Sequence, residues 1–174
     1  MPQNDQIVKE NKSSVKISHP SGLLRVFFRS PIFLYRLHLG WLFGKRALLL
    51  EHLGRKSGLI RKAVIEVVDH DVQKDSYIVA AAWGNQADWY KNIKAQPNVM
   101  VEVGTKRFAA VARMLSADEA AQHLNIYATK HPFAFRQLGS LLFDYKSRDT
   151  VGLIKSMTEA IPFVEFIPAD EKAA

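Results

Sequence analysis

Between residues 46 and 115, this 174-residue chain is divided into short apolar segments separated by tight turns. The segment 60–69, IRKAVIEVVD, alternates apolar with polar residues and is rich in β-branched side chains, which is typical of a strand with one buried face. The same reasoning predicts strands at 46–53, 60–69, 76–83, 98–103, 107–115 and 162–168. About six strands, with helices between and after them, predict a mainly β protein of the α+β type, either a small barrel or a sheet covered by helices.

Three helical segments accompany these strands. Residues 87–95 form a short helix that ends before Pro97. Ser116 and Glu119 are spaced as a capping box, which starts a helix running to about Lys130. Residues 133–158 are expected to be mostly helical. Strands and helices together define one domain at 45–168, followed by a short tail at 169–174.

The chain has no cysteine. This excludes a disulfide scaffold, an iron–sulfur protein, a thiol nucleophile and a cysteine zinc site. None of the six histidines has a second histidine at metal-ligand spacing, so no metal site is predicted. With 48% hydrophobic residues the composition is that of a globular protein, which excludes a disordered chain.

The net charge of +7 comes from one segment of the chain. Residues 11–50 carry seven Lys and Arg and no acid, and the rest of the sequence is balanced. Residues 1–19 are polar and are expected to form a flexible tail. Residues 20–44 are apolar, aromatic and basic, and they predict an amphipathic helical segment kinked at Pro31. It could lie on a membrane surface, pack on the domain or form a homodimer contact. Nucleic acid is not expected, because phosphate-binding cations rarely lie in so apolar a helix.

The N-terminal sequence gives no sign of export. It contains Asp5 and Glu10 and lacks the apolar region of a secretory signal. Its uncharged stretches are shorter than the roughly 20 residues that span a membrane. A cytoplasmic location, with peripheral attachment to the inner face of the membrane as an option, is predicted.

The turn G-R-K-S-G at 54–58 is the first segment that could carry chemistry. Its glycines permit a tight turn, whose N–H groups could form an anion nest. Arg55, Lys56 and Arg61 add positive charge, and Ser57 adds a hydroxyl. The turn therefore predicts a phosphate cradle, with a solvated hairpin turn as the alternative. His52, beside it, is either a ligand contact or a half-buried strand residue.

A second candidate lies where the strand at 76–83 gives way to the helix at 87–95. Strand ends and helix N-termini are places where ligands collect. Trp83 ends the strand, and Trp89 lies in the first turn of the helix. The alternative is that Trp89 and Ile93 only dock the helix on the barrel.

Two motifs resemble those of the deazaflavin-dependent nitroreductase family, which uses coenzyme F420 and includes F420H2-dependent quinone reductases. One is G-R-x-S-G followed by an arginine, here 54–61, and the other is W-Y-x-N-(L/I)-K-A-x-P-x-V, here 89–99. The resemblance covers roughly 45–116, and the strand at 162–168 is also similar. It implies a split β-barrel of flavin-reductase type.

The resemblance also implies the position of the cofactor. Residues of the basic turn would contact the phosphate and tail of F420, and a wall beyond the third strand would border the deazaflavin ring. The expected contacts are Arg55, Lys56, Ser57, Gly58 and Arg61 in the turn, and Ala81, Ala82, Trp83, Trp89 and Asn92 in the wall. Tyr127 and Tyr145 are candidate proton donors, with core or surface packing as the alternative. The family's Ser-Lys-Gly-Gly-like segment is replaced here by 82–85, AWGN, so the substrate side of the pocket differs.

The function implied is an oxidoreductase that transfers a hydride from reduced F420 to a quinone-like or other conjugated electrophile. One alternative is an FMN-binding oxidoreductase with the same barrel. Another is a non-catalytic barrel that carries a lipid or a cofactor. The expected partner is a small-molecule electron acceptor.

Overall fold

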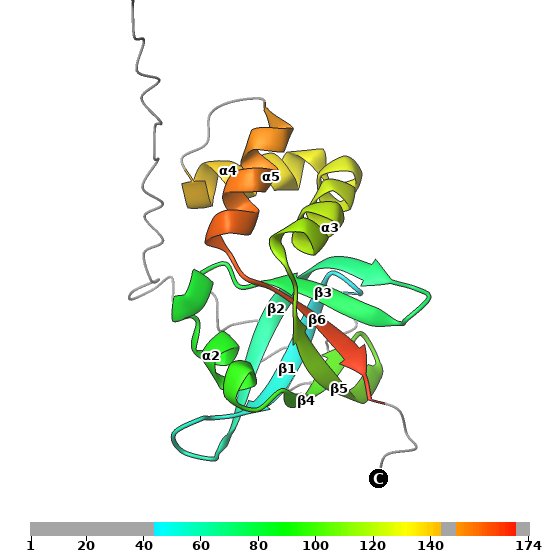
Figure 1. Ribbon diagram of the computed structural model, residues 1–174. Helices are drawn as coiled ribbons and strands as arrows, with labels where there is room; N and C mark the ends of the chain where they lie inside the picture. The colour runs from blue at the N-terminus through cyan, green and yellow to red at the C-terminus, as the bar shows by residue number, and fades with distance from the viewer. Residues whose placement is uncertain (1–43, 144–148, 170–174) are drawn as a thin grey trace, which may run out of the picture.

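The computed structural model describes residues 44–143 and 149–169 (Figure 1). The predicted tail at 1–19 and nearly all of the predicted helical segment at 20–44 lie outside this range, as does most of the C-terminal tail. The six strands lie close to their predicted positions. They are β1 (Ala47–Leu53), β2 (Ile60–Asp71), β3 (Ser76–Ala80), β4 (Asn98–Val103), β5 (Lys106–Met114) and β6 (Phe163–Pro168).

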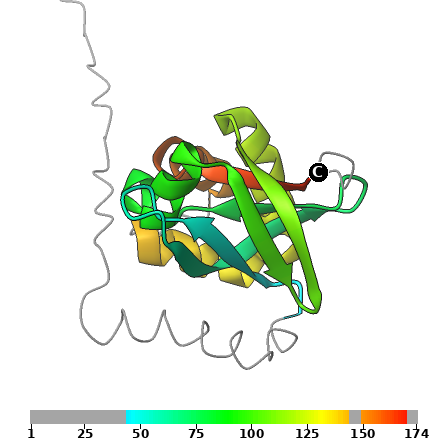
Figure 2. The same cartoon turned by 90° about the horizontal axis from the view of Figure 1, so that it is seen from below.

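The strands form a closed antiparallel barrel in the order β1-β2-β3-β6-β5-β4, with β4 pairing back to β1. This confirms the predicted split barrel. The β1–β2 register pairs Leu53 with Ile60 at one end of β1 and Ala47 with Glu66 at the other. The basic turn at 54–59 therefore projects from one end of the barrel, as the view from below also shows (Figure 2).

The predicted strand at 76–83 is too long by three residues. Its ladder ends at Ala80, and the N–H of Ala81 then donates to the carbonyl of Pro162 at 2.9 Å. Gly84, with φ of 57°, donates to the carbonyl of Ala81 and turns the chain into the short 3-10 helix η2 (Gly84–Gln86). The apolar composition of 81–83 predicts burial correctly but not this change of direction.

Four α-helices complete the fold. The predicted helix at 87–95 is α2 (Asp88–Ala95), and the predicted capping box is present at the start of α3 (Ala117–Lys130). The segment expected to be mostly helical contains α4 (Pro132–Phe143) and α5 (Thr150–Ala160). In Figure 1, α3, α4 and α5 form a layer beside the barrel, whereas α2 lies against the barrel near the basic turn.

Two groups of buried side chains hold these layers together. One fills the barrel and includes Leu50, Val79 and Phe166, each inaccessible to solvent. The other joins the three-helix layer to the outside of the barrel and includes Leu124 and Phe163. No helix in the described ranges is long and apolar enough to cross a membrane.

Candidate functional site

The basic turn is closed by its own backbone. The carbonyl oxygen of Gly54 accepts the N–H groups of Ser57 at 3.1 Å and Gly58 at 2.8 Å, and its N–H donates to Leu59. A Cβ at Gly54 would lie 2.8 Å from the Ser57 hydroxyl and 3.4 Å from the Leu59 carbonyl oxygen, so a larger residue would have to displace the Ser57 side chain. Gly58 has φ of 65°, which also favours glycine. The two glycines are thus required to shape the turn.

This geometry changes how the turn could hold an anion. The N–H groups of Gly54, Ser57 and Gly58 bond to backbone carbonyls, and that of Arg55 donates to the Asn92 side chain. The N–H of Leu59 points at the Ser57 oxygen. The expected nest of free N–H groups is therefore not formed, and recognition of an anion must come chiefly from side chains.

Arg55 ties the turn to α2. Its backbone N–H donates to the Asn92 side-chain oxygen at 3.1 Å, and its Nη1 donates to the same oxygen at 2.8 Å. Both Nη atoms lie 3.2 Å from one carboxylate oxygen of Asp88. The turn and the helix are thereby joined as one polar unit, with Arg55 already engaged by protein acceptors.

His52 completes this unit from inside the barrel. Asn92 and His52 are each only 5% exposed, and the Asn92 amide nitrogen lies 3.2 Å from His52 Nδ1. Because Arg55 can only donate, the Asn92 oxygen must face Arg55 and its NH2 must face His52. His52 Nδ1 is therefore the acceptor, and the ring is neutral. Burial lowers the pKa of His52, which agrees with this assignment.

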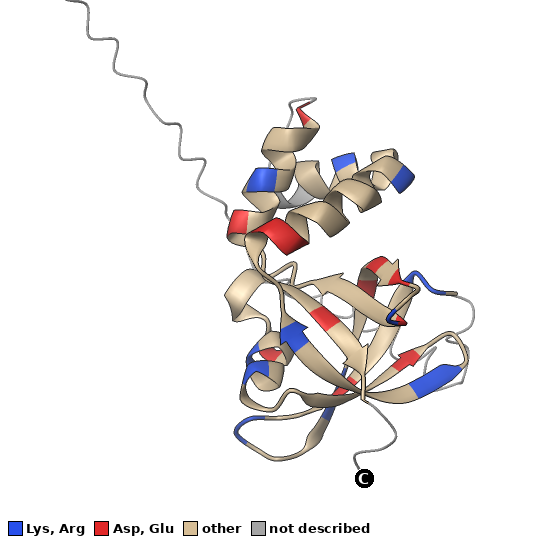
Figure 3. Ribbon diagram, turned by 45° about the vertical axis from the view of Figure 1, so that its right-hand side comes forward, with Lys and Arg blue, Asp and Glu red and all other residues tan. Residues whose placement is uncertain are grey.

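Two cations of the turn region are left for a ligand. Lys56 and Arg61 are exposed and make no ion pair or hydrogen bond with any residue in the described part of the chain. The hydroxyl of Ser57 lies between them in sequence and can still donate its proton. Figure 3 shows basic positions on the β1–β2 turn and on α2 beside it. This end of the barrel is suited to a negatively charged group.

The residues predicted to form the wall lie at the exit from β3 and on α2. Ala81 is fully buried and therefore inaccessible to a ligand here, and Ala82 and Trp83 are half-buried. Trp83 and Trp89 pack partly against the barrel core, and the Trp89 ring meets Tyr90 edge-on at 6.0 Å. Trp89 follows Asp88, the residue of α2 that pairs with Arg55, so it lies close to the basic turn.

Tyr127, one of the two candidate proton donors, does not join this arrangement. Tyr127 is 4% exposed and its hydroxyl donates to Glu66 at 2.9 Å, at the end of β1–β2 opposite the basic turn. Burial, together with the Glu66 carboxylate, raises the pKa of Tyr127. These contacts give Tyr127 the packing role considered as the alternative, and they do not support a role as proton donor. Tyr145 lies outside the described residues.

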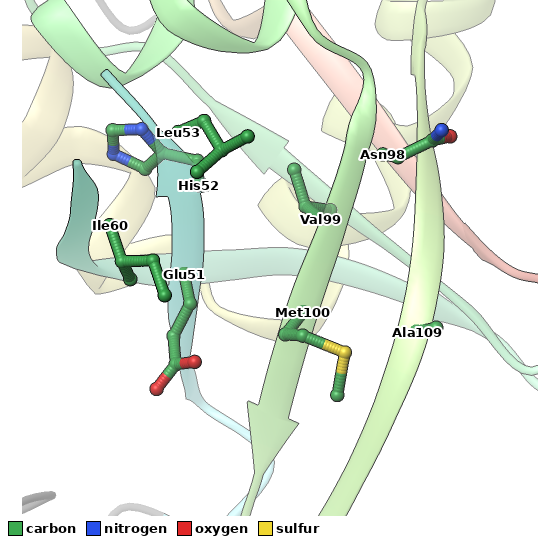
Figure 4. A pocket seen from close by; sticks show the side chains of 8 residues that line it. All are labelled: Glu51, His52, Leu53, Ile60, Asn98, Val99, Met100 and Ala109. Carbon is green, nitrogen blue, oxygen red and sulfur yellow. The ribbon is translucent and has the colours of Figure 1, made fainter. Parts of the chain in front are cut away.

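A hollow of about 320 Å³ lies between β1, the start of β2 and β4, at the end of the barrel that carries the basic turn, and His52 is one of the residues that line it (Figure 4). Its lining is mostly apolar and includes Leu53, Ile60 and Met100. At its edge, Glu51 accepts hydrogen bonds from Arg107 at 2.8 Å and is paired with Lys62. Burial opposes ionisation of Glu51, but these two cations outweigh it and lower the pKa. None of the predicted cofactor contacts lines this hollow.

The sequence did not indicate a role for Asp88, and it left His52 as either a ligand contact or a half-buried strand residue. Asp88 and Asn92 are four residues apart on α2 and therefore lie on one face of the helix. That spacing beside Trp89 was the available signal for a polar link to the turn. The role of His52 as acceptor could not be seen, because it depends on the pairing of β1 with α2 in space.

Comparison with known proteins agrees with the motifs. The family model described as "F420H(2)-dependent quinone reductase" matches residues 37–140, which is more than half of the chain. A Mycobacterium tuberculosis protein, whose name assigns it as an F420H(2)-dependent quinone reductase, is 33% identical over 78 residues. That match covers 43% of this chain and 63% of the relative.

Solved structures support the fold. A structure described as a domain-swapped dimer is 20% identical, with a TM-score of 0.50, and the match covers 79% of this chain and 99% of that one. An F420-H2 dependent reductase is 21% identical with a TM-score of 0.49, over 71% of this chain and 95% of that one. At such identities the likeness concerns fold alone. The family match over residues 37–140, together with both motifs at 54–61 and 89–99, shows that the chain belongs to the F420H(2)-dependent quinone reductase family.

Proposed function

We propose that this protein is an oxidoreductase that binds reduced coenzyme F420 between the basic turn and α2 and passes a hydride to a conjugated electrophile such as a quinone. The observation that carries the proposal is the direct bonding of the turn to α2 through Arg55 and Asn92. The contact supports the proposal because the turn also carries Lys56, and α2 also carries Trp89, within the segment that matches the family.

The residues present fit an anionic cofactor with a flat ring. Lys56, Arg61 and the Ser57 hydroxyl supply charged and neutral donors for a phosphate-bearing tail. The half-buried Trp83 and Trp89 supply an apolar surface for the ring, whereas Ala81 is fully buried and lies behind that surface without access to a ligand. In the described ranges no cluster of potential metal ligands accompanies them.

Each part of the site then has a role of its own. Bound reduced F420 would supply the hydride, as cofactors do in such enzymes. Lys56 and Arg61 hold the tail, Asn92 fixes the turn against α2, and the wall keeps water from one side of the ring. We assign no proton donor, because the contacts of Tyr127 lie at the other end of β1.

The class of electron acceptor is part of the same proposal. The chain spans 63% of the curated relative it matches, so that relative's substrate class is only a starting point. Trp83 stands where a lysine is usual in the family, and a bulky indole favours a flat aromatic acceptor over a charged one. A quinone or nitroaromatic compound fits this wall.

The test is a fluorescence titration. Of the three tryptophans in the chain, Trp83 and Trp89 would lie against the ring, so binding of F420 should quench the emission strongly. Lys56→Met and Arg61→Met should each weaken binding about 10-fold or more, as expected for a charged hydrogen bond. The matched control is Lys62→Met, since Lys62 is already paired with Glu51.

The cofactor alternatives are separated by the same titration. FMN binding in place of F420 binding would indicate an FMN-dependent relative. Binding of neither, with lipid co-purifying, would indicate a carrier barrel and would overturn the proposal. With F420 bound, oxidation of the reduced cofactor by a panel of quinones would establish the reaction.

Other properties extend this proposal. A solved structure of the same fold is described as a domain-swapped dimer, so we propose that this chain can form a homodimer, to be checked by sedimentation. Peripheral membrane contact through residues 20–44 and a cytoplasmic location stay predictions. Vesicle flotation with and without residues 1–43 would test the first of them.

A further inference from the structure

Asp88 places a negative charge inside a region that the proposed function reserves for an anion. Its carboxylate oxygen lies 3.2 Å from both Nη atoms of Arg55. The Asp88 side chain is 84% exposed, whereas that of Arg55 is 28% exposed. Among the described residues, Asp88 is the acid that forms an ion pair with a cation of this turn, and Lys56 and Arg61 form none.

The contacts on the two sides of the Arg55 guanidinium differ in kind, and a third, long contact of 3.5 Å runs from Nη1 to the backbone carbonyl of Asp88. On its inner side the Asn92 oxygen is buried and is fixed in turn by His52. On its outer side the Asp88 carboxylate is open to water, and exposed ion pairs are weak and sensitive to salt. An arriving anion could therefore replace Asp88 without disturbing the inner contact.

We infer that Asp88 is a specificity-determining residue that competes with the ligand's anionic group for Arg55. The inference rests on the proposed function, whose ligand carries a phosphate tail. An anion that displaces Asp88 gains two parallel N–H donors in the geometry that guanidinium offers to phosphate. It must also overcome the repulsion and competition of the carboxylate. Small free anions, which gain nothing from the indole wall, are thereby disfavoured relative to a ligand that also docks its ring.

Asp88→Asn tests this directly, because asparagine keeps the size and loses the charge. We expect the variant to bind F420 about 5- to 20-fold more tightly than the wild type in the fluorescence titration. A deazaflavin without the phosphate tail should bind both proteins equally. Pyrophosphate, measured by its effect on the melting temperature, should stabilise the variant at a lower concentration than the wild type.

Two further variants isolate the mechanism. Asp118→Asn removes another exposed acid, from the first turn of α3, and should leave both affinities unchanged. Adding Arg55→Met to Asp88→Asn should abolish the gain, because the freed donors are then absent. Far-UV circular dichroism confirms that each variant is folded.

The outcomes separate this inference from the proposed function. In one outcome the wild type does not bind F420, but pyrophosphate stabilises Asp88→Asn at a lower concentration than the wild type, and Arg55→Met removes this difference. The proposed function is then wrong, and the inferred competition between Asp88 and the anion is supported. If the wild type binds F420 and Asp88→Asn binds F420 and pyrophosphate no more tightly, the competition is wrong and the function stands. An equal gain in affinity in Asp118→Asn would show that the effect comes from the net charge of the protein, and it would also overturn the inference.

Discussion

Two helices are fastened to the barrel by polar side chains, and they are fastened differently. On α3, His123 and Lys130 contact Asp69 at 2.9 and 3.4 Å, and Tyr127 bonds to Glu66. On α2, the link is the amide of Asn92, held between His52 and Arg55. The α3 side converges on the carboxylate of Asp69, whereas the α2 side is centred on the neutral amide of Asn92 and leaves Lys56 and Arg61 without an acidic partner among the described residues.

The difference separates stability from binding. Around Asp69 each charged group has a partner. Substitution of one of these residues should therefore lower the stability of the protein and have little effect on ligand binding. Lys56 and Arg61 have no acidic partner among the described residues, and as exposed cations they are available to an anionic ligand. We therefore expect substitutions on the α3 side to change stability, and substitutions of Lys56 and Arg61 to change ligand binding.

The largest effect is expected on the α3 side, at the buried Glu165. This carboxylate is 2% exposed and accepts hydrogen bonds from Ser76 at 2.6 Å and from Arg113 at 2.6 and 2.9 Å. Arg113→Met should lower the free energy of unfolding by about 3 kcal/mol, because it leaves a buried charge without its main partner. Urea unfolding measures this loss, and F420 affinity should not change.

The control for this variant is Lys74→Met. Lys74 lies 4.0 Å from Glu165 but is 60% exposed, so its loss should cost less than about 0.5 kcal/mol. Equal losses in the two variants would mean that the Arg113 contact adds nothing special. A fall in F420 affinity in Arg113→Met would contradict the separation of stability on the α3 side from binding on the α2 side.

Asn92→Leu should affect both properties at once. It leaves His52 Nδ1 and the Arg55 guanidinium without the amide that joins them, which should cost about 2 kcal/mol of stability. The turn would no longer be held against α2, so affinity for F420 should fall while affinity for a tail-free deazaflavin changes less. An unaltered F420 affinity would show that the link does not shape the site.

The two sides should also respond differently to pH. The folded pKa of His52 lies below its ordinary value of 6.5, so the unfolded chain takes up the proton first and stability falls as pH drops below about 6.5. Burial opposes ionisation of Asp69, but the bonds from His123 and Lys130 outweigh it and lower the pKa below the ordinary 3.8. The stabilisation from Asp69 is therefore retained above about pH 3.8 and lost as pH falls further.

Urea unfolding at pH 7.5 and pH 5.5 separates these contributions. The wild type should lose stability between the two values, and His52→Gln should lose less. His123→Gln serves as the control on the α3 side. It should lose as much stability between pH 7.5 and pH 5.5 as the wild type does, because His52 is still present. A loss in this range that persists in His52→Gln would assign it to another group.

The smallest effect is expected at the start of α3. The Ser116 hydroxyl accepts the N–H of Glu119 at 3.3 Å, and the Glu119 carboxylate accepts the N–H of Ser116 at 2.9 Å. These bonds and the contact with Arg113 lower the pKa of Glu119 to about 2. Ser116→Ala should cost about 1 kcal/mol in thermal unfolding, with no effect on F420 binding. A loss well above this would mean that the cap also positions Arg113.

The sequence predicted the parts of this molecule that depend on near neighbours. Alternation within 60–69 and the Ser116–Glu119 spacing each report a local periodicity, and both elements formed where expected. The third strand was predicted too long, because apolar composition marks burial and not direction. The family motifs named the residues of the site, yet they could not show that Arg55 is already bound by Asp88 and Asn92. These contacts join Arg55 to two residues that lie 33 and 37 positions further along the chain, so they depend on the folded structure.

The closed strand order has a consequence for how the protein can associate with itself. Each of the six strands pairs with two neighbours, and the pairing of β2 is divided along its length: residues 60–66 pair with β1, and residues 67–71 pair with β3. A second chain that docks by side chains leaves all of these ladders intact. A second chain that exchanges a strand requires the barrel to open, which breaks a ladder first. Assembly by the first route should be fast and reversible, and assembly by the second should be slow and accelerated by partial denaturation.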